Sequence, residues 1–293
     1  MFKRKVFEVL SAIVMSFVLV FLMFTTVGCK SNDTPNKVLL VSIDGMRPDA
    51  IANTEYGKYL ETESAYSLSA RTVYPSVTLP CHMSMFHSIE PNEHGVVENF
   101  YTPSENLGYG IAEALSASQK KTAIFFNWQP IDNVVKPDPN VYSKFIDPSQ
   151  IGWEQANKDT VDACLGYLEN NSPDFTFLYL GFLDEWGHAH GWLSNEYYYA
   201  LNKSLELVDQ VIDSLPSNYT VIITTDHGGH DYTHGTEMVE DMTIPMFVMG
   251  KDFAKAKTFN DASILDVAPT VLDVLGIDKP TYWKGISLRE KII

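Results

Sequence analysis

Short apolar runs alternate with longer amphipathic stretches along most of the chain. The run from Val38 to Ile43 is apolar almost throughout and ends at an Asp-Gly pair, which is typical of a strand buried on both faces of a parallel sheet. Four later runs have the same character: Thr122 to Phe126, Phe175 to Leu183, Thr220 to Thr225 and Ile244 to Met249. We predict that all five are strands.

Helical patterns lie between and after these strands. Apolar residues recur at three- and four-residue spacing in Gly152 to Leu168, Asn195 to Leu215 and Ile264 to Leu275, as in helices that pack on a core. Alternating strands and helices predict an α/β fold, with a mostly parallel sheet between two helical layers. No repeat and no long linker interrupts residues 38–293, so we expect a single domain there.

The N-terminus has the pattern of a targeting segment. Three basic residues at positions 3–5 precede an apolar run up to Val27, and Gly28 stands before Cys29. The pattern resembles a bacterial lipoprotein signal over residues 1–28, with Cys29 lipidated and residues 29–37 as a tether. An uncleaved membrane anchor and simple secretion are the alternatives. All three place the remainder outside the cytoplasm.

Charge and cysteine content narrow the function classes. The 293 residues carry 21 Lys+Arg and 37 Asp+Glu, a formal net charge of −16. Such acidity argues against binding long nucleic acids. Three cysteines cannot form a disulfide framework, so we expect Cys81 and Cys164 to be free and buried. The sequence indicates no obligate protein partner.

Polar residues gather where the predicted strands end. Asp44 follows the first strand, Asp184 the third, and Asp226-His227 the fourth. Sites in α/β sheets form beyond the carboxyl ends of strands, so we expect these side chains to converge. All eight histidines lie in three windows, at positions 82–94, 188–190 and 227–234. Imidazole and carboxylate together are zinc-ligand chemistry.

Each of these features also has an ordinary structural interpretation. Asp184 alone fits a helix N-cap, the sequence from Asp226 to Gly228 fits a polar turn, and His82 fits a core histidine. Thr78 lies between Pro75 and Pro80, which predicts a loop-to-helix junction. There it is either a helix cap or a nucleophile activated by a base or a metal.

Five motifs in one order carry a family resemblance. The chain contains Ser42-Ile43-Asp44-Gly45-Met46-Arg47, Pro75-Ser76-Val77-Thr78-Leu79-Pro80-Cys81-His82, His94-Gly95-Val96-Val97-Glu98-Asn99, Asp184-x-x-Gly187-His188-x-x-Gly191 and Asp226-His227-Gly228…His234. This set resembles the alkaline phosphatase superfamily, and within it the nucleotide pyrophosphatase/phosphodiesterase branch. The resemblance covers nearly all of residues 38–288 and implies an alkaline phosphatase-like three-layer α/β/α sandwich.

The resemblance also implies roles for individual residues. One zinc ion would be held by Asp184, His188 and His234, and a second by Asp44, Asp226 and His227. Thr78 would be the nucleophile at both metals, and Asn99 would hydrogen-bond a phosphoryl oxygen. Manganese or iron are alternative metals, because the same ligands bind them. The implied substrate is a small phosphodiester or nucleotide.

Two departures from the branch concern the substrate pocket. Leu79 stands where related proteins often have an aromatic residue that stacks on a base, so the resemblance implies that Leu79 contacts the substrate. Trp128 is a substitute platform in one interpretation and a core aromatic in the other.

Three other functions remain alternatives. A sulfatase would need Cys or Ser where Thr78 stands and Arg where His82 stands, so the sequence argues against it. A phosphomonoesterase would need an extra cationic group, for which Arg47 is the candidate. A non-catalytic surface lipoprotein that binds a metal or ligand would use the same scaffold.

Overall fold

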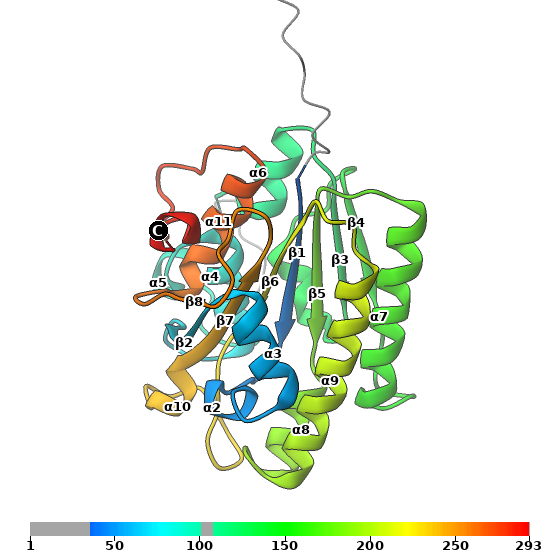
Figure 1. Cartoon of the computed structure of the whole chain (residues 1–293), viewed down its shortest axis with the longest axis vertical. Coiled ribbons are helices and arrows are strands. Elements are labelled where there is room, and N and C mark those ends of the chain that lie inside the picture. Colours follow the sequence, from blue (N-terminus) through cyan, green and yellow to red (C-terminus); the bar gives the residue numbers. More distant parts are fainter. Residues whose placement is uncertain (1–35, 101–107, 293) are drawn as a thin grey trace, which may run out of the picture. The chain divides into compact units, whose positions relative to one another are not determined.

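The computed structural model describes residues 36–100 and 108–292, which form one compact unit from Asn36 onward. A sheet of eight strands runs through its centre, in the order β4-β3-β5-β1-β6-β7-β2-β8 (Figure 1). The strands are β1 (Lys37–Ile43), β2 (Ala65–Arg71), β3 (Thr122–Phe126), β4 (Val141–Phe145), β5 (Phe175–Leu180), β6 (Tyr219–Thr224), β7 (Thr243–Met249) and β8 (Lys257–Thr258).

The five strands from β4 to β6 are parallel, and β7 is antiparallel to both of its neighbours, β6 and β2. Strand β1 lies between β5 and β6. The carboxyl ends of these three parallel strands therefore meet at one edge of the sheet, near α8 and α2 in Figure 1.

Helices cover both faces of this sheet (Figure 1). The helical elements are α2 (Pro48–Ile51), α3 (Glu55–Glu63), α4 (Thr78–His87), α5 (Pro91–His94), α6 (Ile111–Ala117), η1 (Gln129–Val134), α7 (Trp153–Asn170), α8 (Phe182–His190), α9 (Asn195–Ser214), α10 (Val239–Met242), η2 (Ile264–Asp266), α11 (Val267–Val274) and α12 (Leu288–Lys291).

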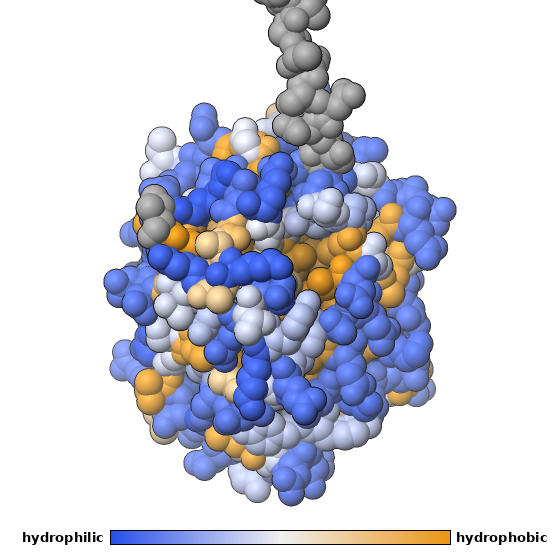
Figure 2. Space-filling model, viewed as in Figure 1, coloured by the Kyte–Doolittle hydropathy of each residue, from blue (hydrophilic) through white to orange (hydrophobic). Residues whose placement is uncertain are grey.

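Strand β1 shows why its sequence is apolar without alternation. Val38 and Leu40 pack into one core cluster, with α4, α6 and α11. Leu39, Val41 and Ile43 pack into the other, with α2, α3, α7, α8 and α9. A strand between two helical layers buries both faces. The outward side of α7 and α9 is mostly hydrophilic, as expected for amphipathic helices (Figure 2).

The predicted three-layer α/β/α fold is confirmed, with corrections to individual elements. The run from Phe175 to Leu183 is a strand only to Leu180, and its last two residues open α8. The helix predicted from Ile264 begins as the 3-10 turn η2. Strands β2, β4 and β8 were not predicted. Strand β4 is partly exposed at the sheet edge and β8 has two residues, so neither forms a long apolar run.

Several predictions concern residues near the N-terminus. The signal segment 1–28 and Cys29 lie outside the described residues. Of the predicted tether, Asn36 and Lys37 are described, and Lys37 begins β1. Within residues 36–100 and 108–292, no helix is long and apolar enough to cross a membrane. Cys81 and Cys164 are free and buried, as predicted.

Candidate active site at the carboxyl ends of three strands

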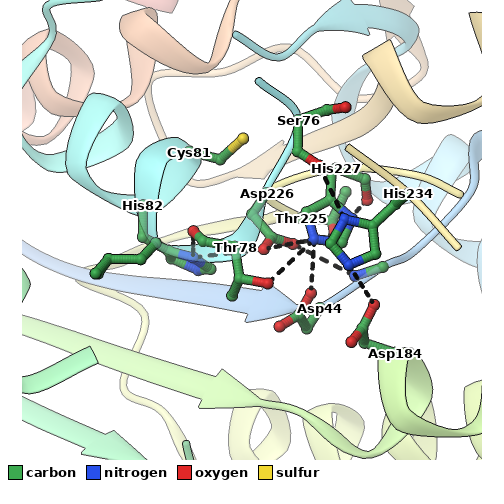
Figure 3. Close-up of polar contacts among 12 residues, drawn as sticks. Asp44, Ser76, Thr78, Cys81, His82, Asp184, Thr225, Asp226, His227 and His234 are labelled. Carbon is green, nitrogen blue, oxygen red and sulfur yellow. Dashed lines mark hydrogen bonds and ion pairs between the residues drawn. The ribbon is translucent and has the colours of Figure 1, made fainter. Parts of the chain in front are cut away.

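Thr78 is the first residue of α4, a helix in which all ten residues are buried. The N-cap residue before it is Val77, so the Thr78 hydroxyl is not used to cap the helix. Instead its Oγ1 lies 3.2 Å from Nε2 of His227 (Figure 3). The structure therefore turns this hydroxyl toward the predicted metal ligands.

One group of ligands, which we call the rim set, consists of Asp184, His188 and His234. Helix α8 supplies Asp184 and His188 one turn apart, with Oδ2 and Nε2 separated by 3.5 Å. His234 comes from the loop after β6, and its Nε2 lies 3.8 Å from Asp184 Oδ1 (Figure 3). The three ligand atoms lie within 4.8 Å of one another, a spacing at which one ion can bind all three.

The second group, the buried set, consists of Asp44, Asp226 and His227 at the ends of β1 and β6. Nε2 of His227 lies 3.4 Å from Asp44 Oδ1 and 3.3 Å from Asp226 Oδ2. Asp184 also lies within 4.8 Å of Asp44 and His227, so it adjoins both sets. The His227 and His234 rings stack with centroids 3.7 Å apart. The two sets thus form one continuous cluster.

Every histidine of the two sets is oriented by a backbone carbonyl. The Nδ1 atom of His188 bonds the Tyr232 carbonyl at 2.9 Å, that of His227 the Gly228 carbonyl at 2.8 Å, and that of His234 the Ser76 carbonyl at 2.9 Å. A carbonyl only accepts, so each Nδ1 carries a proton, and in the neutral form of each ring Nε2 keeps its lone pair. Such a second bond is typical of histidines that bind metals.

The carboxylates also fit a divalent cation. Asp44 Oδ1, Asp184 Oδ1 and Asp226 Oδ2 are buried and have no hydrogen-bond partner among the described residues. Burial and the nearby charges of Asp226 and Asp184 raise the pKa of Asp44 well above its usual range. Burial and Asp226 likewise raise the pKa of Asp184. Unpaired buried charges are costly, and a bound cation would compensate them.

Burial and neighbouring charges also shift the pKa values of His234 and Asp226. Burial and the neighbouring His227 lower the pKa of His234 to about 3, so this histidine is neutral at ordinary pH. Burial alone would raise the pKa of Asp226, but His227 and His82 lower it overall. The cluster therefore combines imidazole nitrogens with carboxylate oxygens, a donor set that suits zinc.

Buried amides hold the N-terminus of the helix that carries the rim set. The Gly181 N–H donates to Asn127 Oδ1 at 3.0 Å, and the Phe182 N–H donates to Asn157 Oδ1 at 3.3 Å. Asn127 in turn donates to Asn157 at 2.7 Å, and Asn157 donates to Ser204 at 3.2 Å. These contacts satisfy free N–H groups at the start of α8 and fix the helix two residues before Asp184.

The site includes residues that sequence analysis assigned no role in it. His82 is fully buried, with Nδ1 2.8 Å from the Thr78 carbonyl and 3.5 Å from Asp226 Oδ2. Its position one turn after Thr78 was the available signal. Tyr179, on β5, donates its hydroxyl to Asp44 Oδ2. This contact left no signal in the sequence, because β5 and β1 are far apart in the chain and become neighbours only in the folded sheet.

The predicted substrate-contacting residues have different environments. Asn99 is exposed, and its Oδ1 accepts the Leu79 backbone N–H at 2.9 Å. This bond brings the Asn99 amide beside Thr78. The Leu79 side chain, however, is fully buried in the core, which does not match the predicted substrate contact. Trp128 is half-buried, with its ring 6.4 Å from that of Tyr179, so it lies near Asp44.

Arg47 is occupied by contacts within the fold. Its Nε and Nη2 donate to the Asp49 carboxylate at 2.9 and 2.7 Å, and its Nη1 donates to the Gly229 carbonyl at 3.1 Å. The guanidinium is thus paired with a bidentate carboxylate. These contacts support a structural role rather than binding of a second phosphate charge.

Comparisons with known proteins identify a family and a shared fold. Residues 38–245 match the family described as type I phosphodiesterase / nucleotide pyrophosphatase. A mouse ectonucleotide pyrophosphatase/phosphodiesterase family member 1 is 28% identical over 237 residues, which cover 68% of this chain and 26% of that protein. The chain therefore spans about a quarter of that relative.

Solved structures share the fold at low sequence identity. Murine ectonucleotide pyrophosphatase/phosphodiesterase 5, solved as an inactive threonine-to-alanine variant in complex with AMP, has a TM-score of 0.70 and 14% identity, covering 88% of this chain and 100% of that one. The phosphonate monoester hydrolase of Agrobacterium radiobacter has a TM-score of 0.69 and 12% identity, covering 88% and 77%. Both likenesses concern the fold.

The family match spans most of the chain and includes every residue of the rim set and of the buried set. This protein is a member of the type I phosphodiesterase / nucleotide pyrophosphatase family.

Proposed function

We propose that this protein is a metal-dependent phosphodiesterase in which Thr78 is the nucleophile and small phosphodiesters or nucleotides are the substrates. The observation that carries the proposal is the Thr78 hydroxyl, 3.2 Å from His227 Nε2 at the edge of a cluster of buried carboxylates and histidines. A threonine hydroxyl reacts at neutral pH only when a base or a metal activates it.

The rim set and the buried set would each hold one zinc ion, with manganese or iron as alternative metals. Bound there, the two ions would lower the pKa of the nucleophile and neutralise charge on the phosphoryl oxygens. The chain itself contributes orientation. The backbone carbonyls of Tyr232, Gly228 and Ser76 hold the three imidazoles in the tautomer that leaves Nε2 free.

Thr78 and Asn99 would act directly on the substrate. In this proposal the Thr78 oxygen bonds to phosphorus as the bond to the leaving alcohol breaks, and water later releases the phosphoryl group from Thr78. The Asn99 amide N–H would donate to a phosphoryl oxygen, because its Oδ1 is already held by the Leu79 N–H. Donors aimed at developing charge contribute strongly to catalysis.

Two observations favour diesters over monoesters. Arg47, the candidate for binding a second phosphate charge, is paired with Asp49 and Gly229. The family match is to a family described as type I phosphodiesterase / nucleotide pyrophosphatase. Trp128, half-buried and near Tyr179, is our candidate for stacking on an aromatic leaving group or base.

Hydrolysis assays on the chain from residue 30 test this proposal. Bis-p-nitrophenyl phosphate, p-nitrophenyl phosphate and p-nitrophenyl sulfate would be compared with added zinc. We expect the diester to be preferred. Thr78→Ala should lower its turnover by about 10³-fold or more, as loss of a nucleophile does in other hydrolases. Thr78→Ser, which keeps a hydroxyl, is the matched control and should retain measurable activity.

The alternatives give different results. Preferred cleavage of the monoester would reassign the substrate while keeping the nucleophile. Cleavage that survives in Thr78→Ala would contradict the assigned nucleophile. No cleavage of any ester, with zinc bound, would favour the non-catalytic binding function.

We also propose that the protein acts outside the cytoplasm, tethered to a bacterial membrane through a lipid on Cys29. The support is the sequence pattern of residues 1–29. Membrane fractionation of cells that express the full chain, with Cys29→Ser as the matched variant, tests it. Equal membrane association of both would reject lipidation and favour an uncleaved anchor.

A further inference from the structure

Trp192 lies in the turn between α8 and α9, and it belongs to none of the sequence motifs. Its side chain is 7% exposed. The indole N–H donates to the Gly45 carbonyl at 2.9 Å, next to Asp44 of the buried set. Its backbone N–H donates to the Asp231 carbonyl at 2.8 Å, in the loop that leads to His234. One residue thus joins segments that carry both ligand sets.

The indole ring also packs against two histidines of the rim set. Its centroid lies 5.1 Å from that of His188, with the rings nearly perpendicular, and 6.0 Å from that of His234. His188 and His234 come from different elements, and their own rings lie 5.0 Å apart. The Trp192 ring therefore packs against both rim-set histidines at once.

Two glycines make room for this ring. A Cβ on Gly187, in α8, would lie 2.7 Å from the indole Cε2 atom. A Cβ on Gly229, two residues after His227, would lie 2.2 Å from the same atom. Real Cβ atoms do not approach so closely, so both positions exclude a side chain while the ring stays in place. Gly187 directly precedes His188, and the ring thus sets how closely the two segments approach.

We propose that Trp192 is a positioning residue that sets the spacing between the rim set and the buried set. The inference rests on the proposed function, because it concerns the ligands that we assign to the two zinc ions. Through these contacts Trp192 links four segments, namely the Asp44 turn, helix α8, the His227 turn and the His234 loop. Residues that orient metal ligands typically change metal affinity by about 10- to 100-fold when mutated.

Zinc titration by calorimetry tests the proposal. We expect two zinc ions per wild-type chain. Trp192→Leu removes the ring and the N–H, and we expect it to weaken zinc binding at one or both sites by about 10- to 100-fold. Trp186→Phe is the matched control on α8, because that ring contacts Phe182 and His190 instead. It should bind both ions as the wild type does.

A second pair of variants separates positioning from general packing. Gly187→Ala favours helix, so its cost should come from the ring that it displaces. We expect the single variant Gly187→Ala to weaken zinc binding. In Gly187→Ala/Trp192→Phe the smaller ring leaves space, so the double variant should bind zinc better than the sum of the two single effects predicts. This cycle also applies if Trp192→Leu does not fold.

Fluorescence gives an independent readout. Bound Co²⁺ should quench Trp192 emission, and this quenching should disappear in Trp192→Phe and persist in Trp186→Phe. Wild-type zinc affinity at both sites in folded Trp192→Leu, or additive effects in the cycle, would overturn the positioning role. A wild-type chain that binds no zinc at either set would instead overturn the proposed function.

Discussion

The rim set and the buried set use the same residue types in different surroundings. The side chains of the buried set are at most 2% exposed. In the rim set, His188 is 39% exposed and Asp184 and His234 about a tenth. The buried set extends directly from β1 and β6, at the centre of the sheet. The rim set depends on helix α8 and on the loop that carries His234.

The difference shows which parts of the site are determined by the fold itself. Neighbouring parallel strands fix the relative positions of Asp44 and Asp226, because their register is continuous through Ser42 and Thr224. The rim set needs additional contacts, from Asn127 and Asn157 below α8 and from Trp192 behind the histidines. We therefore expect the ion at the rim set to exchange more readily.

The largest expected effect separates the two sets directly. His227→Ala should lower diesterase kcat by about 10³-fold, near the upper end for loss of one stabilising group, because a fully buried ligand has no substitute. His188→Ala should cost about 10²-fold and should recover in excess zinc by mass action. Steady-state kinetics across a zinc series measures both.

His190→Ala, on the exposed side of the same helix, is the control and should match the wild type. If His188→Ala and His227→Ala lost the same activity and neither responded to zinc, the distinction between the two sets would be wrong.

A smaller effect is expected at Asn99, which is exposed and accepts the Leu79 N–H beside Thr78. Asn99→Ala should lower kcat by about 10²-fold with little change in KM, because a donor to the transition state is removed. Asn92→Ala, at an exposed position of helix α5, should leave kcat unchanged. A pure rise in KM for Asn99→Ala would show that the amide binds the ground state equally well.

The smallest effect on kcat is expected at Asn157, which holds the N-terminus of α8. Asn157→Leu leaves the Phe182 N–H and the side-chain N–H of Asn127 without their acceptor, which should lower the free energy of unfolding by about 1–3 kcal/mol. It should also lower kcat by about tenfold, because the rim ligands shift. Asn170→Leu is the control for denaturant unfolding, because Asn170 is exposed and lies on the same helix as Asn157, α7. An unchanged free energy of unfolding in Asn157→Leu would show that the buried amides do not hold α8.

The sequence was sufficient for the central sheet and for the gathering of the ligands. Continuous apolar runs identify β1, β3 and β6 because strands under two helical layers have no polar face. Asp44 and Asp226 follow those runs, and the carboxyl ends of parallel strands meet. The end of β5 was misplaced, because Phe182 and Leu183 are as apolar in the first turn of α8 as they would be in a strand.

The supporting residues could not be predicted in the same way. Trp192, Tyr179 and Asn157 reach the site through contacts between distant segments, and an isolated Trp, Tyr or Asn carries no spacing signal. Leu79 shows the reverse case. Its place beside Thr78 in sequence suggested a substrate contact, but the helix that begins at Thr78 turns its side chain into the core.

The central claim is that two ions bind side by side, one at each set. Anomalous diffraction at the zinc absorption edge, from zinc-soaked crystals of the chain from residue 30, tests it most directly. We predict two peaks, one bounded by Asp184, His188 and His234 and the other by Asp44, Asp226 and His227. A single peak, or peaks bound to other residues, would contradict the two-metal account.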